Sequence, residues 1–566
     1  MFEWIFGLGL VISFYNAWGG GANDCANSFA TSVGSGVLTL KGALVIASIF
    51  EFSGAVLMGS HVTDMVRKQI VSIDMFEDNP GALMLGMLCA NLASAIWLTI
   101  ATYFKLPVST THSIIGSIMG FALCYGGWDG IAWDKIGLVA ASWIISPFLA
   151  GLFSISFFAL INQFVFKTED PVAKIITLIP ALIFMTFLIN TIFIIYKGSP
   201  QLELDETPFW VSFLVSFAIS LGLAILARVL YVPYVKRKIG FDEIQNGNAN
   251  GNANGNEIGD GNEGTIETSI RTISYNEAMS TNTVAGVTTD ETDVDSIVPA
   301  TEAASGDGDG EANTTSVYDG IIVSEEKSDK ENIIILKKGI KELELKMSDE
   351  ETAELHSNAQ EINPEADKLC SWVQIITACF SSFAHGSNDV ANAVAPLAAI
   401  YYIYKKNEIS QSADVPVWVL LIGGLGIVFG LATWGYKIIY SMGKKITKIS
   451  PSRGFIIELA SALTVIIASR FEIPVSTTHC QVGSIVGCGL ISGIKNIKWS
   501  LLKNIVMSWI VTLPVTALLS ASLFSFAYFS PNELNERDNL AEYVNVTGNG
   551  SGSGLDVLAS GTDDVF

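Results

Sequence analysis

Charged residues are scarce in this chain: only 15% of its 566 residues are Asp, Glu, Lys or Arg, while 50% are hydrophobic. Its mean hydropathy is +0.44. A soluble protein of this length cannot leave so little charge on its surface, so the composition excludes that class. We expect a polytopic membrane protein that is surrounded by the lipid bilayer and has no nucleic-acid partner.

The sequence also lacks the motifs of several enzyme classes. Its seven cysteines fall in apolar segments without paired metal spacing, so we expect neither a disulfide framework nor a zinc site. No Gly-x-x-x-x-Gly-Lys-Ser/Thr loop and no Gly-x-Ser-x-Gly turn is present. We therefore predict no enzyme activity and no cofactor, and any driven process would have to use an ion gradient rather than ATP hydrolysis.

Basic residues are few overall, which gives a net charge of −23, but the acidity is local. Residues 235–368 hold 29 acidic and 11 basic side chains, and 531–566 hold seven and one. The acidic charge therefore belongs to polar segments outside the membrane part. It argues neither for nor against an anionic substrate.

Apolar and polar segments alternate in a way that predicts four regions. The first is a transmembrane repeat with scaffold helices at 1–235, followed by a disordered cytoplasmic loop at 236–368 rich in Asn, Gly, Ser, Thr, Asp and Glu. A second, inverted transmembrane repeat follows at 369–530, with an extracellular polar tail at 531–566. The stretches long enough to cross a bilayer are 2–20, 42–60, 82–104, 106–126, 137–162, 174–197, 208–234, 370–403, 414–441, 455–470, 473–493 and 499–530.

Two motifs occur twice, in the same order. Pro107-Val-Ser-Thr-Thr-His112 returns unchanged as Pro474-Val-Ser-Thr-Thr-His479, and Gly21-Ala-Asn-Asp-Cys-Ala-Asn27 is matched by Gly386-Ser-Asn-Asp-Val-Ala-Asn392. Both pairs are separated by nearly the same number of residues. The chain is therefore an internal duplication.

The Pro-Val-Ser-Thr-Thr-His motifs lie between short apolar arms, which favours two re-entrant helical hairpins. An odd number of crossings then precedes the central loop and turns the second copy upside down, as in secondary transporters. The predicted fold class is an all-α polytopic membrane protein, an inverted-topology repeat of about 12 transmembrane elements. Basic residues such as those at 236–238 place the central loop in the cytoplasm and both termini outside.

Hydroxyl groups gather at the predicted hairpin tips. At the start of a half-helix, they combine with unpaired backbone N–H groups and the positive end of the helix dipole, which suits an oxyanion such as phosphate or sulfate. The alternative is that they only cap a break in a membrane helix. The candidate anion-binding residues are Ser109, Thr110, Thr111, Ser476, Thr477 and Thr478.

The other motif places amides and a carboxylate together inside apolar sequence. Hard oxygen ligands beside a glycine-loosened backbone suit a small monovalent cation, and a carboxylate in the membrane needs a cation or a proton. Alternatively, these groups form a hydrogen-bonded network that only fixes helix packing. The candidate cation-binding residues are Asn23, Asp24, Asn27, Asn388, Asp389 and Asn392.

Lone ionisable side chains complete the set of candidates. Glu51 and Glu458 stand in otherwise apolar spans and could carry a proton, balance the cation, or be structural. His112, His385 and His479 are predicted to orient the backbone or to contact the anion.

Together, the two hairpin motifs, Gly21–Ser28 and Gly386–Asn392 resemble the inorganic phosphate transporter (PiT) family of sodium-coupled or proton-coupled symporters. The resemblance covers about 1–235 and 370–530. It implies phosphate contacts from the six hydroxyl residues, cation contacts from the six Asn and Asp residues, and a transport role for Glu51 and Glu458.

We accordingly predict a sodium-coupled symporter that imports inorganic phosphate by alternating access, in the plasma membrane, with the vacuolar membrane as the alternative. Coupling to H⁺, another oxyanion as substrate, and a phosphate sensor or receptor with little transport are the alternatives. The oligomeric state is left open by the sequence, and a homo-oligomer is compatible with it.

Overall fold

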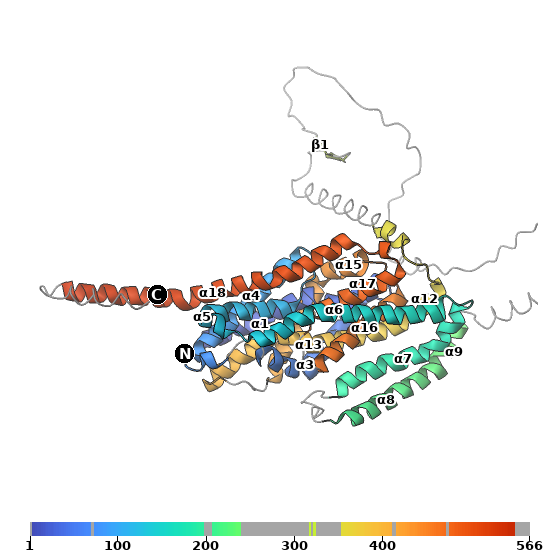
Figure 1. Cartoon of the computed structure of the whole chain (residues 1–566), viewed down its shortest axis with the longest axis horizontal. Coiled ribbons are helices and arrows are strands. Elements are labelled where there is room, and N and C mark those ends of the chain that lie inside the picture. The colour runs from blue at the N-terminus through green and yellow to red at the C-terminus, as the bar shows by residue number, and fades with distance from the viewer. Residues whose placement is uncertain are drawn as a thin grey trace, which may run out of the picture. The chain divides into compact units, whose positions relative to one another are not determined.

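The protein is described here by a computed structural model that covers residues 3–68, 73–196, 207–238, 316–318, 321–323, 352–409, 415–470 and 475–548. The chain forms two compact units: Met1–Lys236 with Met347–Phe566, and Arg237–Lys346. Within the second unit, strands β1 (Ser316–Tyr318) and β2 (Ile321–Val323) pair antiparallel, with Val317 opposite Ile322. The first unit is helical (Figure 1).

The helices of the first unit follow the apolar stretches of the sequence. Several begin at side-chain caps that satisfy the first backbone N–H groups; Asn79 starts α4 and Asp170 starts α7 in this way, each followed by proline. Up to the central loop the helices are α1 (Glu3–Asn23), α2 (Ala26–Gly34), α3 (Leu40–Lys68), η1 (Ile73–Phe76), α4 (Pro80–Tyr103), α5 (Thr110–Gly126), η2 (Gly127–Gly130), α6 (Trp133–Ile161), η3 (Asn162–Phe166), α7 (Pro171–Ile195), α8 (Phe209–Leu226), η5 (Ala227–Tyr231) and α9 (Val232–Lys238).

After the central loop the helical pattern resumes. The elements are α12 (Pro364–Leu369), α13 (Ser371–Lys406), α14 (Val417–Gly430), η6 (Leu431–Gly435), α15 (Tyr436–Lys445), α16 (Pro451–Arg470), α17 (Thr477–Ser492), η7 (Ile494–Asn496) and α18 (Trp499–Gly548). The all-α membrane fold predicted from the sequence is confirmed, with the short β1–β2 pair as its only strands in the described residues.

Eight helices of the described part of the chain are long and apolar enough to cross a membrane. They include α4 and α16, the first arms of the two predicted hairpins. They do not include α1 or α13. The eight spans are Leu40–Ser60, Pro80–Tyr103, Ile136–Phe166, Pro171–Ile195, Phe209–Arg237, Val417–Lys445, Pro451–Ala468 and Trp499–Ser530.

Structured elements occur within two of the predicted polar regions. In residues 352–368, Asn363 caps α12, and Asp367 and Gln360 bond to the membrane part. Composition alone could not reveal such individual bonds. At the other end, the last helix continues to Gly548, well into the segment 531–566 predicted as a polar tail.

The two hairpins are antiparallel helix pairs, which we name hairpin 1 (α4 and α5) and hairpin 2 (α16 and α17). Each packs against a helix of the other half of the chain: α5 lies along α18, and α17 lies along α6. Glycines allow this close approach. A Cβ atom at Gly120 would meet the carbonyl of Ala517, and one at the equivalent Gly487 would meet the carbonyl of Gly151.

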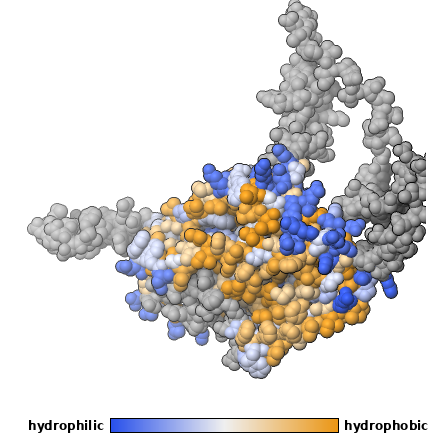
Figure 2. Space-filling model, turned by 45° about the vertical axis from the view of Figure 1, so that its right-hand side comes forward, coloured by the Kyte–Doolittle hydropathy of each residue, from blue (hydrophilic) through white to orange (hydrophobic). Residues whose placement is uncertain are grey.

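Large apolar side chains cover much of the outer face of the helical unit (Figure 2). Phe148 on α6 is 74% exposed, Trp210 on α8 is 65% exposed and Leu518 on α18 is 68% exposed. Apolar surface on this scale is stable against lipid rather than water. The polar residues described next lie inside the bundle.

Candidate functional site

The site begins at a break in the first helix. α1 ends at Asn23 and α2 starts at Ala26, and the intervening turn is closed by the Asp24 N–H, which donates to the Gly20 carbonyl at 2.7 Å. The sequence predicted one span here, at 2–20, and did not separate α2. The second copy differs, because α13 runs unbroken through Asp389. Only the first copy therefore has the interrupted helix in this structure.

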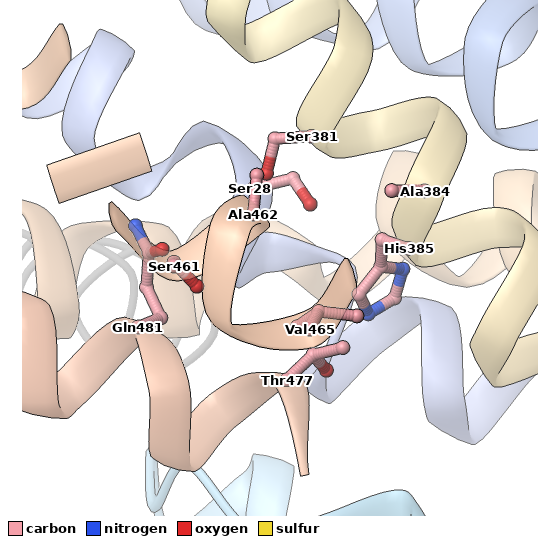
Figure 3. Close-up of a pocket in the computed structure, with 9 residues that line it drawn as sticks. All are labelled: Ser28, Ser381, Ala384, His385, Ser461, Ala462, Val465, Thr477 and Gln481. Carbon is pink, nitrogen blue, oxygen red and sulfur yellow. The ribbon is translucent and has the colours of Figure 1, made fainter. Parts of the chain in front are cut away.

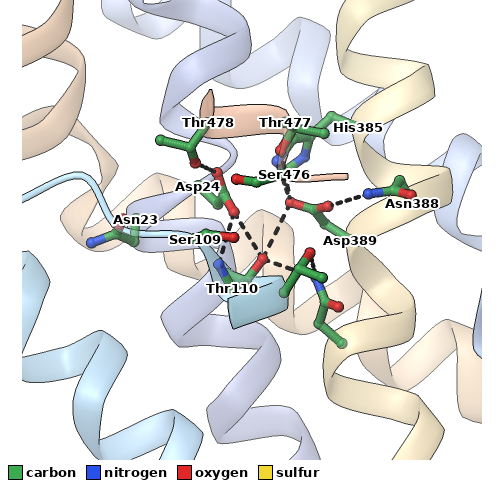
Figure 4. A network of polar contacts seen from close by, with 12 residues as sticks. Asn23, Asp24, Ser109, Thr110, His385, Asn388, Asp389, Ser476, Thr477 and Thr478 are labelled. Carbon is green, nitrogen blue, oxygen red and sulfur yellow. Dashed lines mark hydrogen bonds and ion pairs between the residues drawn. The ribbon is translucent and has the colours of Figure 1, made fainter. Parts of the chain in front are cut away.

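Asp24 lies between the tips of both hairpins. Its Oδ2 accepts the backbone N–H of Thr110 at 3.1 Å and the Thr110 hydroxyl at 2.8 Å. Its Oδ1 accepts the hydroxyl of Thr478 from hairpin 2. The same Thr478 hydroxyl lies 3.3 Å from the carbonyl of Val108 in hairpin 1. The two threonine-rich tips therefore meet at one carboxylate (Figure 4).

Asp389 lies next to Asp24 and shares the Thr110 hydroxyl with it. Its Oδ2 is 3.4 Å from the Thr110 hydroxyl and 3.3 Å from the Thr477 hydroxyl. His385, one helical turn earlier on α13, places Nε2 2.7 Å from the same oxygen, and the Asn388 amide donates to Oδ1 at 2.8 Å. Each hairpin thus supplies a threonine hydroxyl to Asp389 as well.

Two buried carboxylates share the Thr110 hydroxyl, which places two acidic groups side by side at the centre. Asp24 is 1% exposed and Asp389 is 6% exposed. Two adjacent carboxylates in a low-dielectric interior require a neutralising cation or proton. Ligand atoms of Asp24, His385 and Asp389 lie within 4.8 Å of one another. The oxygen atoms of this group are the hard ligands that a small cation prefers.

The amide residues of the predicted cation set have different positions. Asn392 donates to the hydroxyls of Thr110 at 2.9 Å and Thr111 at 3.3 Å, so it faces the centre. Asn23 instead holds the loop before α5, bonding to Thr102, Leu106 and Val108. The side chain of Asn27 lies outside the described part of the structure.

The serines of the two hairpin motifs act as helix caps. Ser109 Oγ accepts the N–H of His112 at 3.2 Å, and Ser476 Oγ accepts the N–H of His479 at 3.3 Å. This is the usual N-cap geometry. The caps hold the first turns of α5 and α17, so that the threonines next to them point to the carboxylates.

A second chain of buried polar groups leads away from Asp389. His385 Nδ1 lies 3.0 Å from Glu51 Oε2, and Ser382 donates to Glu51 Oε1 at 3.1 Å. The imidazole of His385 therefore bridges the carboxylates of Glu51 on α3 and Asp389 on α13. Glu51, predicted as a coupling residue, is in this way linked to Asp389 through the His385 side chain.

Glu458 lies apart from this group and is surrounded by hydroxyls. It accepts from Thr31 at 2.5 Å, from Ser32 at 2.8 Å and from Thr377. The sequence did not identify these three partners, although Thr31 and Ser32 follow the first motif closely on α2. At the equivalent position of the first copy, Asn91 bonds to Asn16 and Ser13. At this position the second copy therefore has a carboxylate, Glu458, and the first copy has an amide, Asn91.

The two motif histidines form a buried contact behind the tips. The rings of His112 and His479 lie 4.5 Å apart, and they pack on Trp143 at 4.1 Å and Trp509 at 3.7 Å respectively. Neither histidine bonds to Asp24 or Asp389 in the structure. They join the two hairpins through ring packing rather than by contacting the central carboxylates.

Two small cavities flank the carboxylates. One, of about 20 Å³, is lined by Ser28, His385, Ser461, Thr477 and Gln481 among others (Figure 3). The other, of about 10 Å³, is lined by Asn16, Thr110, Asp389 and Asn392 among others. Each has room for about one water molecule or one small cation. Small cavities therefore adjoin the polar groups at the centre.

Helices that break or end at the centre of an apolar bundle, with carboxylates and hydroxyls gathered there, define a membrane transporter and not an enzyme. The comparisons agree: the chain belongs to the phosphate transporter family, whose profile matches residues 20–520. The family resemblance found in the sequence is confirmed.

Named relatives span nearly the whole chain. "Sodium-dependent phosphate transporter 2" of Felis catus is 33% identical, covering 93% of this chain and 98% of its own length. "Sodium-dependent phosphate transporter 1" of Mus musculus is 31% identical, covering 92% and 95%. A solved structure titled "The sodium-dependent phosphate transporter" aligns with a TM-score of 0.65 at 29% identity, over 93% of this chain and 99% of that one.

Proposed function

We propose that this protein is a symporter that carries inorganic phosphate into the cytoplasm together with Na⁺ by alternating access. The observation that carries the proposal is the convergence of both hairpin tips on one pair of carboxylates, through Thr110, Thr477 and Thr478. The names of the relatives support phosphate as the anion and Na⁺ as the cation.

The contacts of Asp24 suggest an order of binding. The Thr110 amide and the Thr478 hydroxyl now donate to this carboxylate, and phosphate oxygens would need the same donors. A cation bound between Asp24 and Asp389 would neutralise their charge and draw their oxygens toward it. The donors at the two helix starts would then be available to phosphate, so Na⁺ binds first.

The repeated contacts support the inverted-repeat arrangement proposed from the sequence. Equivalent helices exchange partners between the halves, since α5 lies along α18 while α17 lies along α6. We propose that the hairpins rock between these partners and expose the centre to each side in turn. We place the protein in the plasma membrane, with both termini outside and the central loop in the cytoplasm.

Counterflow of labelled phosphate in proteoliposomes tests the function, with the Na⁺ and pH gradients imposed separately. We expect accumulation driven by the Na⁺ gradient alone. Accumulation driven by the pH gradient alone would favour H⁺ coupling, for which the buried Glu51–His385–Asp389 chain is the structural argument. Absence of counterflow in either case would favour a sensor with little transport.

Removing hydroxyls at the tips should weaken phosphate binding more than Na⁺ binding. Thr110→Val and Thr477→Val keep the side-chain shape but lose the donor. A bond to a charged group contributes about 1.5–3 kcal/mol, so the phosphate KM should rise about 10- to 100-fold for each. The matched variants Thr110→Ser and Thr477→Ser retain the hydroxyl and should keep a phosphate KM near that of the wild type. An equal loss of Na⁺ and phosphate affinity in the valine variants would contradict the division of roles.

A further inference from the structure

Arg453 is the largest fully buried side chain in the described residues, at 2% exposure. In the described part of the chain it forms no ion pair with a carboxylate. Its Nε donates to Ser492 Oγ at 3.1 Å, and one terminal nitrogen donates to the Gln360 carbonyl at 2.5 Å. The guanidinium also lies 5.8 Å from the ring centre of Phe158 on α6. A buried guanidinium without hydrogen-bond partners would be costly. The Ser492 hydroxyl and the Gln360 carbonyl supply such partners and so fix the position of Arg453.

The Gln360 carbonyl belongs to a segment that we name the strap, residues 356–367. The Gln360 N–H donates to the Ser492 carbonyl at 2.7 Å. Its side-chain amide pairs with that of Asn162 at the end of α6, at 2.8 and 3.1 Å. Through one residue, the strap therefore joins the last turn of α17 to α6.

The two ends of the strap add further bonds. Asp367 Oδ1 accepts the N–H of Ser452 at 2.9 Å and the hydroxyl of Ser450 at 3.0 Å, and so caps the start of α16. His356 Nε2 lies 3.1 Å from the Lys444 carbonyl at the end of α15. The strap thus holds both arms of hairpin 2 at the end away from its threonine tip.

Among the described residues, hairpin 1 shows no such polar junction at the equivalent position. The residue that corresponds to Arg453 by the repeat spacing is Gly86, and Phe121 packs directly against it. Phe76 and Tyr125 stack there with ring centres 4.5 Å apart. The far end of hairpin 1 is therefore closed by aromatic packing, and that of hairpin 2 by a polar junction that depends on the strap.

We propose that Arg453 and the strap position hairpin 2 and thereby bias the direction in which the phosphate site faces. This inference rests on the proposed transport function. Arg453 touches neither ligand and acts through hairpin 2. If Arg453 holds hairpin 2 in one facing state, loss of one of its bonds should shift the equilibrium between the two facing states by about 10- to 100-fold. A shift of that size changes the population of the two facing states and hence the apparent affinity on each side.

Hydrogen–deuterium exchange in the full-length protein tests the positioning without reference to transport. In Arg453→Lys, and in Gln360→Ala combined with Asn162→Ala, amides at 475–492 should exchange about tenfold faster or more, while those at 110–126 are unchanged. Ser357→Ala is the matched control, because its exposed hydroxyl bonds only to the Glu354 carbonyl within the same turn. Equal acceleration in both hairpins, or acceleration in neither, would overturn the proposal.

Transport measurements distinguish failure of this inference from failure of the proposed function. In the same variants the phosphate KM should change in opposite senses for uptake and for efflux, because one facing state gains population at the cost of the other. A merely structural role would lower the maximal rate in both directions with KM unchanged, which contradicts the proposal. A wild-type protein that moves no phosphate would refute the transport function and leave the exchange result to decide the positioning role.

Discussion

Asp24→Asn and Asp389→Asn should each abolish Na⁺-driven phosphate uptake, lowering it by about 100-fold or more. Both carboxylates are buried, and both contact the Thr110 hydroxyl. In the proposed cation-bound state each carboxylate is a charge partner of Na⁺; removing one partner of a buried ion pair costs about 3–5 kcal/mol, and each 1.4 kcal/mol is a factor of ten. With one charge gone, the remaining carboxylate cannot hold a cation as tightly, so the threonine donors are not released to phosphate.

The measurement is initial uptake of labelled phosphate in proteoliposomes that contain equal amounts of folded protein. Asp134→Asn is the matched control, since it makes the same change of charge on an exposed residue in the first turn of α6. This control should transport like the wild type. Normal Na⁺-driven uptake in either Asp24→Asn or Asp389→Asn would remove the cation site from the mechanism.

Gly120→Ala should cause a severe loss of folded protein, although it adds only one methyl group. The new Cβ would overlap the backbone carbonyl of Ala517, which cannot move without displacing α18. Overpacking of this kind costs about 1–3 kcal/mol, and more where backbone must shift. We expect Gly487→Ala to behave alike, because its Cβ would overlap the carbonyl of Gly151 on α6.

Thermal unfolding in detergent, followed by the yield of monodisperse protein, measures this effect. Gly137→Ala is the control: it lies within α6, and nothing comes within 4 Å of an added Cβ. Because alanine favours helix over glycine by about 0.5–1 kcal/mol, this control should be neutral or slightly stabilising. Similar melting behaviour of Gly120→Ala and Gly137→Ala would contradict the close packing of α5 on α18.

Much of the fold could be predicted because apolar length and internal repetition are properties of the sequence itself. The repeated Pro-Val-Ser-Thr-Thr-His motifs located both hairpins, and Ser109 and Ser476 start helices where hydroxyl residues usually do. The break after Asn23 was not predicted, since nothing in the sequence distinguishes the first motif from the second strongly enough to interrupt only α1.

The candidate site was predicted in its parts but not in its pairings. Sequence reasoning grouped Asn23 with Asp24 because they are adjacent, yet their side chains point to different partners: Asn23 to the loop before α5, Asp24 to the threonines. It could not place Thr31, Ser32 and Thr377 around Glu458, because those contacts join segments more than 80 residues apart. Such pairings depend on which helices pack together, and the residue patterns of a single sequence do not predict that.

The exchange of partners between the two halves has a consequence for how the protein is made. Hairpin 1 is synthesised early, but the helix it packs along, α18, begins only at Trp499. Until the ribosome has produced that last segment, the glycine face of α5 has no protein neighbour and must rest against lipid or a chaperone. The cluster of carboxylates and threonines is thus assembled at the end of biosynthesis, and a chain that stops before residue 499 would contain both threonine motifs without being able to hold them in place.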